Sequence, residues 1–175
     1  MIKKIISGGQ TRVDSAALDA AILAKITYGG WCPKGRINEN GVISKNYDAL
    51  KEISGNFKNE QENYDTRTKY NIHDSDGTLI LVPSIPLPVK IKDGTLLTIQ
   101  EVQRQKKTHI MIDLSKSPQE NAEIIICWIK EYKINILNVA GPRESNSRGI
   151  YHLSLELLIR TFPYTANNYV YKSKF

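Results

Sequence analysis

The stretch IISGGQTRVDSAALDAA, residues 5–21, decides the fold. A short apolar strand runs directly into two glycines and a polar turn, and an alanine-rich segment follows without a spacer. The alanines recur at helical spacing, so one face of a helix over residues 14–25 stays small enough to pack closely on a sheet. A strand that turns at once into a helix is typical of parallel α/β sheets. The stretch therefore predicts an α/β fold.

Further strands and helices alternate along the rest of the chain. The pattern predicts strands over residues 3–7, 27–31, 77–82, 108–114 and 134–140, and helices over residues 14–25, 95–107, 118–133 and 149–162. Several strands are continuous apolar runs such as GTLILV, which suits strands buried on both faces of a parallel sheet. We expect residues 1–175 to form a single domain with a Rossmann-like, three-layer α/β fold and a mainly parallel sheet of about five or more strands.

Local signals define the helix that begins at Pro118. Ser117 suits the N-cap, Pro118 the first helical position, and Glu120 closes a capping box. The predicted apolar face of this helix contains Ile125, Trp128, Ile129 and Tyr132, and that of the last helix contains Ile150, Leu153 and Leu157.

Two regions interrupt the alternation of strands and helices. Residues 33–71 are polar and rich in Asn, Lys and Glu, and we interpret them as a long loop region of the kind that is usually functional or mobile. Residues 163–175 are expected to form a tail outside the core.

Composition limits the classes of partner and location. The net charge is +6 and the pI about 9.2, but the lysines are scattered without an aromatic–basic repeat, so we interpret them as solubilising charge and do not expect nucleic-acid binding. No stretch approaches the length of a membrane span or the apolar core of a signal peptide. The two cysteines match no zinc spacing. We expect a cytoplasmic protein with reduced thiols, and a homo-oligomer of unspecified size.

Three polar loops follow predicted strands or precede predicted helices: SGGQTRVD, KDGTLLT and AGPRESNSRG. Ligands of open parallel sheets collect where strands end and helices begin, and glycines with free helix N–H groups suit an anionic oxygen. The predicted ligand-binding residues are Gly8, Gly9, Gln10, Thr11, Arg12, Asp14, Gly94, Thr95, Thr98, Gly141, Pro142, Arg143, Glu144 and Ser145. We expect Asp14 to order the first loop by capping. A tight turn, a simple N-cap and a salt-bridged turn are the structural alternatives for the three loops.

Several motifs in order resemble one known family. SGGQTRVDSAALDAA, GGWCPKGR, YDTRTKYNIHDSDGTLIL, DGTLLT and NVAGPRES followed by GIY resemble the putative molybdenum carrier family from residue 2 to about residue 162. That family is similar to molybdenum cofactor carrier proteins, and its wider fold group includes the Lonely-guy phosphoribohydrolases and DNA-processing protein A. The resemblance implies a protein that binds a nucleotide-, pterin- or phosphate-bearing small molecule. Its cofactor or cargo would be the molybdenum cofactor, molybdate or a nucleotide.

The sequence departs from the family pattern in the first two loops. Arg12 and Ser15 stand where the family has glycine and arginine, and Asp93 stands where a glycine is usual. Position 12 is therefore expected to need a positive φ. One hypothesis is that the Arg12 guanidinium reaches the anion from its new position. The alternative is that the site has decayed and Arg12 fills it. Asp93 would oppose an anion, which leaves the role of the middle loop open.

The main functional alternative is an enzyme of the Lonely-guy type. Those proteins use a glutamate in a Gly-rich motif to assist glycosidic cleavage. Here Thr98 occupies the position of that glutamate, the double glycine is missing, and Glu101 lies one turn further on as a substitute. We therefore favour a carrier without catalytic residues and keep a nucleotide phosphoribohydrolase as the alternative.

Other side chains have a structural and a functional interpretation. Asp74 and Asp76, which lie a short way after Arg67, would mostly order a turn; capping of the third strand, orientation of loop arginines and a metal held with water are the alternatives. His73 would be an ion-paired or surface residue more often than a base. Cys32 would be either a small half-buried residue or a thiolate favoured by Lys34 and Arg36. Trp31 is predicted to be a packing anchor, with stacking on a ligand as the alternative.

Overall fold

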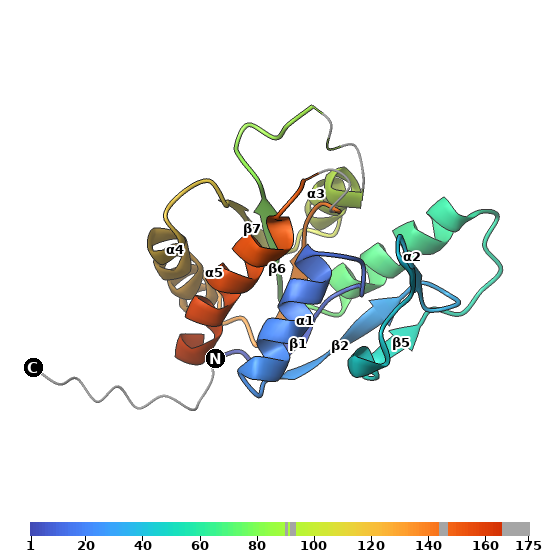
Figure 1. Ribbon diagram of the computed structural model, residues 1–175, viewed down its shortest axis with the longest axis horizontal. Helices are drawn as coiled ribbons and strands as arrows, with labels where there is room; N and C mark the ends of the chain where they lie inside the picture. The colour runs from blue at the N-terminus through green and yellow to red at the C-terminus, as the bar shows by residue number, and fades with distance from the viewer. Residues whose placement is uncertain (90, 92–93, 144–146, 166–175) are drawn as a thin grey trace, which may run out of the picture.

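The computed structural model describes residues 1–175 except 90, 92–93, 144–146 and 166–175, and it omits the side chain of residue 164. It confirms the Rossmann-like, three-layer α/β fold: a six-stranded parallel sheet in the order β5-β2-β1-β8-β6-β7 lies between two layers of helices (Figure 1). The strands of the sheet are β1 (Lys4–Ile6), β2 (Thr27–Cys32), β5 (Leu50–Glu52), β6 (Gly77–Val82), β7 (Thr108–Asp113) and β8 (Ile136–Ala140). The α-helices are α1 (Val13–Leu23), α2 (Glu60–His73), α3 (Gly94–Arg104), α4 (Pro118–Glu131) and α5 (Ile150–Thr165).

The order of the strands creates a crevice at their carboxyl ends. Helices α1, α4 and α5 pack together on one face of the sheet, and α2 packs with α3 on the other (Figure 1). Strand β8 lies beside β6, but the chain leaves β8 toward α5 on one face and leaves β6 toward α3 on the opposite face. Ligands of open α/β sheets bind where neighbouring strands connect to opposite faces. The fold therefore places the first and last predicted loops beside the start of α3.

The core confirms the strand and helix pattern and corrects two of its inward positions. All six residues of β6 are buried, as a continuous apolar run predicts. The Ser117 hydroxyl accepts a hydrogen bond from the Glu120 amide at 3.4 Å, and Pro118 begins α4. Tyr132 and Leu153, predicted to face inward, are 52% and 42% exposed, and Tyr132 is the C-cap residue that follows the end of α4 at Glu131.

The prediction of a long loop over residues 33–71 is wrong. The segment contains the hairpin of β3 (Ile37–Asn38) and β4 (Gly41–Val42), the 3₁₀ turn η1 (Lys45–Tyr47), the edge strand β5 and most of α2. Helix α2 has no apolar stripe: its buried residues are Asn63, Thr68, Asn71 and Ile72. Hydrophobic periodicity, the main sequence signal for a helix, is therefore nearly absent from it. None of the helices in the described part of the chain has the length and apolar character needed to cross a membrane.

Candidate binding pocket at the carboxyl ends of the strands

The three predicted loops meet at one small pocket. From the predicted set, the pocket is lined by Gln10, Asp14, Gly94, Thr98, Gly141 and Arg143. Gly8, Gly9, Thr11, Arg12, Thr95 and Pro142 belong to the same loops but do not line it, and Glu144 and Ser145 lie outside the described residues. The volume is about 30 Å³, which suffices for about two water molecules or one compact group. Any larger ligand would place only a part of itself in this pocket.

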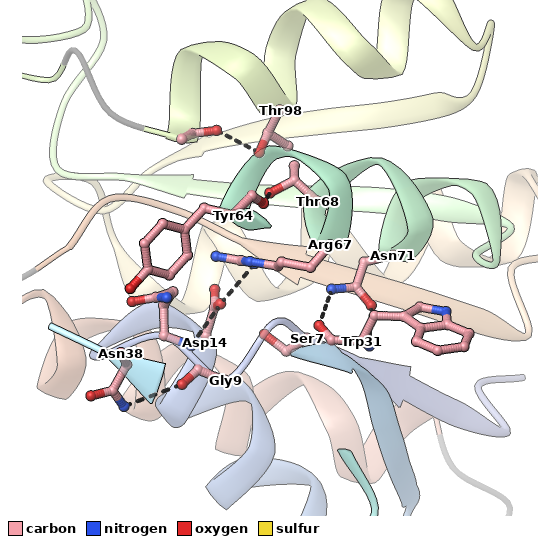
Figure 2. A network of polar contacts seen from close by, with 12 residues as sticks. Ser7, Gly9, Asp14, Trp31, Asn38, Tyr64, Arg67, Thr68, Asn71 and Thr98 are labelled. Atoms are coloured by element: carbon pink, nitrogen blue, oxygen red, sulfur yellow. Dashed lines mark hydrogen bonds and ion pairs between the residues drawn. The ribbon is translucent and has the colours of Figure 1, made fainter. Parts of the chain in front are cut away.

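Apart from Ala140 at the end of β8, helix α2 supplies the rest of the lining, which the sequence interpretation did not include. Gln61, Tyr64, Asp65, Arg67 and Thr68 line the pocket from this helix. Figure 2 shows the Tyr64 ring and the Arg67 guanidinium extending from α2 toward Asp14. The N-cap asparagine of α2, Asn59, accepts a hydrogen bond from the Glu62 amide at 2.9 Å. That capping pattern was the available sequence signal for a helix here.

Arg67 lies directly over the first glycine of the first loop. Its Nη1 is 3.3 Å from Oδ2 of Asp14, and both side chains are almost fully buried (Figure 2). A Cβ added at Gly8 would lie only 1.7 Å from Arg67 Nη1. A larger residue at position 8 would therefore displace the Arg67 guanidinium from its present place, and the first loop and α2 contact each other directly here.

Asp14 holds this unit together from the start of α1. Its Oδ2 accepts a hydrogen bond from the Gln10 amide at 3.1 Å, which is the predicted ordering of the first loop by capping. Burial raises the pKa of Asp14, and the nearby Arg67 guanidinium opposes this increase. The carboxylate is thus costly to bury and depends on its cation.

The strongest sign of a missing partner is the side chain of Gln10. The residue is 3% exposed and lines the pocket, yet neither Oε1 nor Nε2 has a hydrogen-bond partner among the described residues. Nε of Arg67 is also buried without a partner in the described part of the chain. Buried polar groups are nearly always hydrogen-bonded, so two such groups at one pocket need a water molecule or a ligand.

Arg143 places a second guanidinium at the pocket, from the loop after β8. Its Cζ lies 5.0 Å from the centre of the Tyr64 ring, a cation–π contact that joins the last loop to α2. Arg67 and Arg143 thus bring two positive charges to one small, partly enclosed space. Guanidinium groups match the geometry of phosphate and other oxyanions.

Arg12 has the predicted backbone and does not line the pocket. Its φ is 79° at the N-cap of α1, which confirms the expectation of a positive φ at this position. The hairpin of β3 and β4 covers the first loop on the outside: Thr11 hydrogen-bonds Glu39, and Asn38 Nδ2 donates to the Gly9 carbonyl at 3.4 Å (Figure 2). A direct contact between Arg12 and an anion stays a prediction.

The predicted substitute for a catalytic glutamate is engaged elsewhere. Glu101 is buried and accepts hydrogen bonds from Arg104 Nη2 and Gln105 Nε2, both at 2.6 Å. The bond from Arg104 lowers the pKa of Glu101, and the residue is not part of the pocket lining. Thr98 lines the pocket, but its hydroxyl donates to the Gly94 carbonyl at 2.8 Å (Figure 2).

The remaining candidates have structural partners. Trp31 packs edge-on against Tyr70 and donates from Nε1 to Asp74 at 2.7 Å, as expected for a packing anchor. Asp76 Oδ2 accepts from the amides of Asn135 and Ile136, so it caps the start of β8. No cluster of His, Cys, Asp and Glu side chains suited to a metal ion occurs among the residues that the structure describes.

The structure does not support a reactive thiolate at Cys32. Its side chain is fully buried, and burial raises the pKa of the thiol despite nearby Arg36. Cys127 is exposed. We expect a thiol reagent to modify one cysteine of the native protein rapidly, and mass spectrometry of peptides should identify it as Cys127, with Cys32 reacting only after denaturation. Rapid modification of Cys32 in the native protein would contradict this assignment.

The comparisons with known proteins agree with this architecture. A family model described as "Circularly permutated YpsA SLOG family" matches residues 5–162. A crystal structure of a "Putative molybdenum carrier protein" from Syntrophus aciditrophicus SB is 42% identical in sequence and superposes with a TM-score of 0.80, over 90% of this chain and 92% of that chain. No match was found among curated proteins.

Proposed function

Because the chain belongs to the circularly permutated YpsA SLOG family, we propose that it is a carrier-type protein that binds the oxyanion group of a nucleotide-, pterin- or phosphate-bearing small molecule. The proposed site is the pocket formed by the first and last loops, the start of α3 and helix α2. The buried, unpartnered amide of Gln10 carries the proposal, because it marks a position where a polar partner is missing from the described residues.

The donors of the lining support an oxyanion, although Asp14 and Asp65 place two carboxylates at the same pocket and Asp14 already pairs with Arg67. Arg67 and Arg143 supply charged donors, and the Gln10 amide supplies both a donor and an acceptor. Gly94 begins α3, so the positive end of that helix dipole lies at the pocket wall. An oxygen-rich anionic group of about the size of a phosphate would satisfy these donors together.

The same donors determine which part of a molybdenum compound the pocket would bind. The molybdenum carrier from Syntrophus aciditrophicus SB is similar over most of this chain, which makes molybdate or a molybdenum cofactor a reasonable cargo. Guanidinium and amide groups suit the oxygens of molybdate or the phosphate of such a cofactor. The guanidinium groups would hold these oxygens and would not coordinate the metal itself, since they are cationic donors without an available electron pair.

Calorimetric titration with sodium molybdate, inorganic phosphate and AMP tests this proposal. We expect at least one of these probes to bind the wild-type protein, and Arg143→Ala to bind it about tenfold to a hundredfold more weakly, because hydrogen bonds to charged groups contribute about 1.5–3 kcal/mol. Arg160→Ala is the matched control: Arg160 is half-exposed, pairs with Glu156 on α5 and should leave binding unchanged.

The outcomes separate the alternatives. Equal binding by wild type and Arg143→Ala, or no binding of any of the three probes, would contradict the proposed site.

Chromatography of the AMP samples tests the phosphoribohydrolase alternative. We expect no release of adenine, since Glu101 is held by Arg104 outside the pocket. Release of adenine would show that the protein is a phosphoribohydrolase and not a carrier. Elemental analysis of protein from its own host would show whether molybdenum is the cargo.

A further inference from the structure

The Gln10 side chain restricts which oxyanion can fill the pocket, a restriction that rests on the function proposed above. Gln10 is 3% exposed and lines the pocket, and neither Oε1 nor Nε2 has a hydrogen-bond partner among the described residues. The amide oxygen can only accept a hydrogen bond, and the amide nitrogen can only donate one. A ligand that satisfies this side chain must therefore offer a hydrogen-bond donor as well as an acceptor.

The charged side chains of the lining balance one another. Two arginines and two carboxylates line the pocket, so their formal charges cancel: Arg67, Arg143, Asp14 and Asp65. Tyr64 on α2 and the α3 residues Gly94 and Thr98 add no formal charge to the lining. An anion without a proton would therefore meet little net positive charge here, and a ligand is held mainly by hydrogen bonds that it both donates and accepts.

Asp65 offers a second acceptor for a proton of the ligand. The other carboxylate, Asp14, is engaged by Arg67 at 3.3 Å and by the Gln10 amide at 3.1 Å. Asp65 accepts a hydrogen bond from Gln61 Nε2 on Oδ1 at 2.6 Å, and its Oδ2 has no partner within the part of the chain that the structure describes. A carboxylate oxygen repels an oxyanion unless a proton lies between them, so Asp65 and Gln10 Oε1 require the same feature of the ligand.

We infer that the pocket selects a phosphate group that carries a proton over tetrahedral anions that carry none, such as molybdate and sulfate. The hydroxyl of a protonated phosphate donates to Gln10 Oε1, while its other oxygens accept from Gln10 Nε2 and Arg67 Nε. Molybdate and sulfate have only acceptor oxygens at neutral pH, so they would leave Oε1 buried and unpaired. The pocket, at about 30 Å³, has no room for a bridging water molecule once an anion fills it. A molybdenum cofactor would accordingly be held through its phosphate.

Calorimetric titration with sodium phosphate, sulfate and molybdate at pH 7 tests this selectivity. We expect phosphate to bind at least about tenfold more tightly than the other two anions, because a buried acceptor that stays unpaired keeps its full desolvation cost. In Gln10→Met, phosphate should bind more weakly, and the ratio of phosphate to sulfate affinity should fall to about threefold or less, since the unpaired oxygen is gone. Gln119→Met is the matched control: Gln119 is exposed on α4 and the ratio should stay at the wild-type value.

The pH dependence of binding to the wild-type protein provides a second test that needs no variant. AMP loses the second proton of its phosphate near about pH 6, whereas inorganic phosphate keeps a proton at both pH 5.5 and pH 8. We expect the affinity for AMP to fall at least about tenfold between these pH values and that for inorganic phosphate to change by less than about threefold. Sulfate has no proton at either pH, so it reports titration of the protein, including Asp14, whose pKa burial raises.

The possible results separate this selectivity from the site itself. Equal affinities for the three anions, tighter binding of molybdate than of phosphate, or an AMP affinity that does not change with pH would overturn the selectivity and leave the oxyanion site in place. Binding of inorganic phosphate without binding of AMP would keep the selectivity and identify the free anion as the ligand. If none of the probes binds, both the selectivity and the proposed site are wrong.

Discussion

Replacing Arg67 with methionine is expected to destabilise the protein by about 3 kcal/mol at pH 7, since breaking a buried ion pair leaves the other charge without compensation. Arg67 and Asp14 are 13% and 4% exposed, so water cannot replace the lost cation. For a chain of this length such a loss lowers the melting temperature by about 6 to 12 °C. Thermal unfolding followed by circular dichroism measures it.

The pH dependence of this loss has a defined sign. Burial raises the pKa of Asp14 in the folded protein, and removing Arg67 takes away an interaction that lowers it. The folded protein then binds a proton that the unfolded chain releases above about pH 4. Stability linked to Asp14 is therefore present below the unfolded pKa and is lost as the pH rises through the folded pKa. We expect the difference in the free energy of unfolding between the wild type and Arg67→Met to become smaller as the pH falls.

Two controls make this result specific. Arg160→Met removes an arginine from an exposed pair and should change stability by less than about 1 kcal/mol. Adding Asp14→Asn to Arg67→Met should recover part of the lost stability, because the amide keeps an acceptor for the Gln10 N–H without a buried charge. A deficit that is the same at every pH, or no deficit, would contradict the role of the pair.

Gly141→Ala is expected to destabilise the protein by about 3 kcal/mol through overpacking. A Cβ at this position would lie 2.5 Å from the Leu81 carbonyl oxygen and 2.7 Å from Val13 Cγ2. The first contact is with the backbone of β6 and the second with the buried first residue of α1, so neither neighbour can move cheaply. Chemical denaturation with urea measures the loss.

Gly94→Ala provides a control from the same pocket. Gly94 also lines the pocket, but a Cβ there would meet nothing within 4 Å, and we expect a change of no more than about 0.5 kcal/mol. Equal stability of the two variants would show that β6, β8 and α1 pack less closely at the pocket than the structure indicates.

The sequence predicted the parts of this site that have strong local signals. Continuous apolar strands such as β6 and the capping of α4 by Ser117 depend on nearest neighbours, and both are confirmed. The positive φ of Arg12 followed from the departure from glycine at that position and is also confirmed. The common location of the three loops followed from the predicted parallel sheet, because the carboxyl ends of parallel strands share one edge.

Helix α2 was missed because polar groups replace apolar packing on its inner side. Asn71 Oδ1 accepts from the Trp31 amide at 2.7 Å, and its Nδ2 donates to the Trp31 carbonyl at 2.9 Å (Figure 2). Asn63 likewise accepts from the Lys34 amide at 2.9 Å. These side chains satisfy backbone groups of the segment they cover, a contact that only the tertiary structure reveals. Arg67 was considered but not assigned to the site, because its position depends on that helix.

The central claim is that the side chains of Gln10 and Arg67 bind an oxyanion. Nuclear magnetic resonance of the isotope-labelled protein during titration with molybdate, phosphate or AMP tests this claim most directly. We predict that the side-chain Nε2 amide of Gln10 and the Nε–H of Arg67 shift together, saturably and with one dissociation constant. If a probe binds elsewhere while both side-chain signals stay unchanged, the pocket is not the binding site.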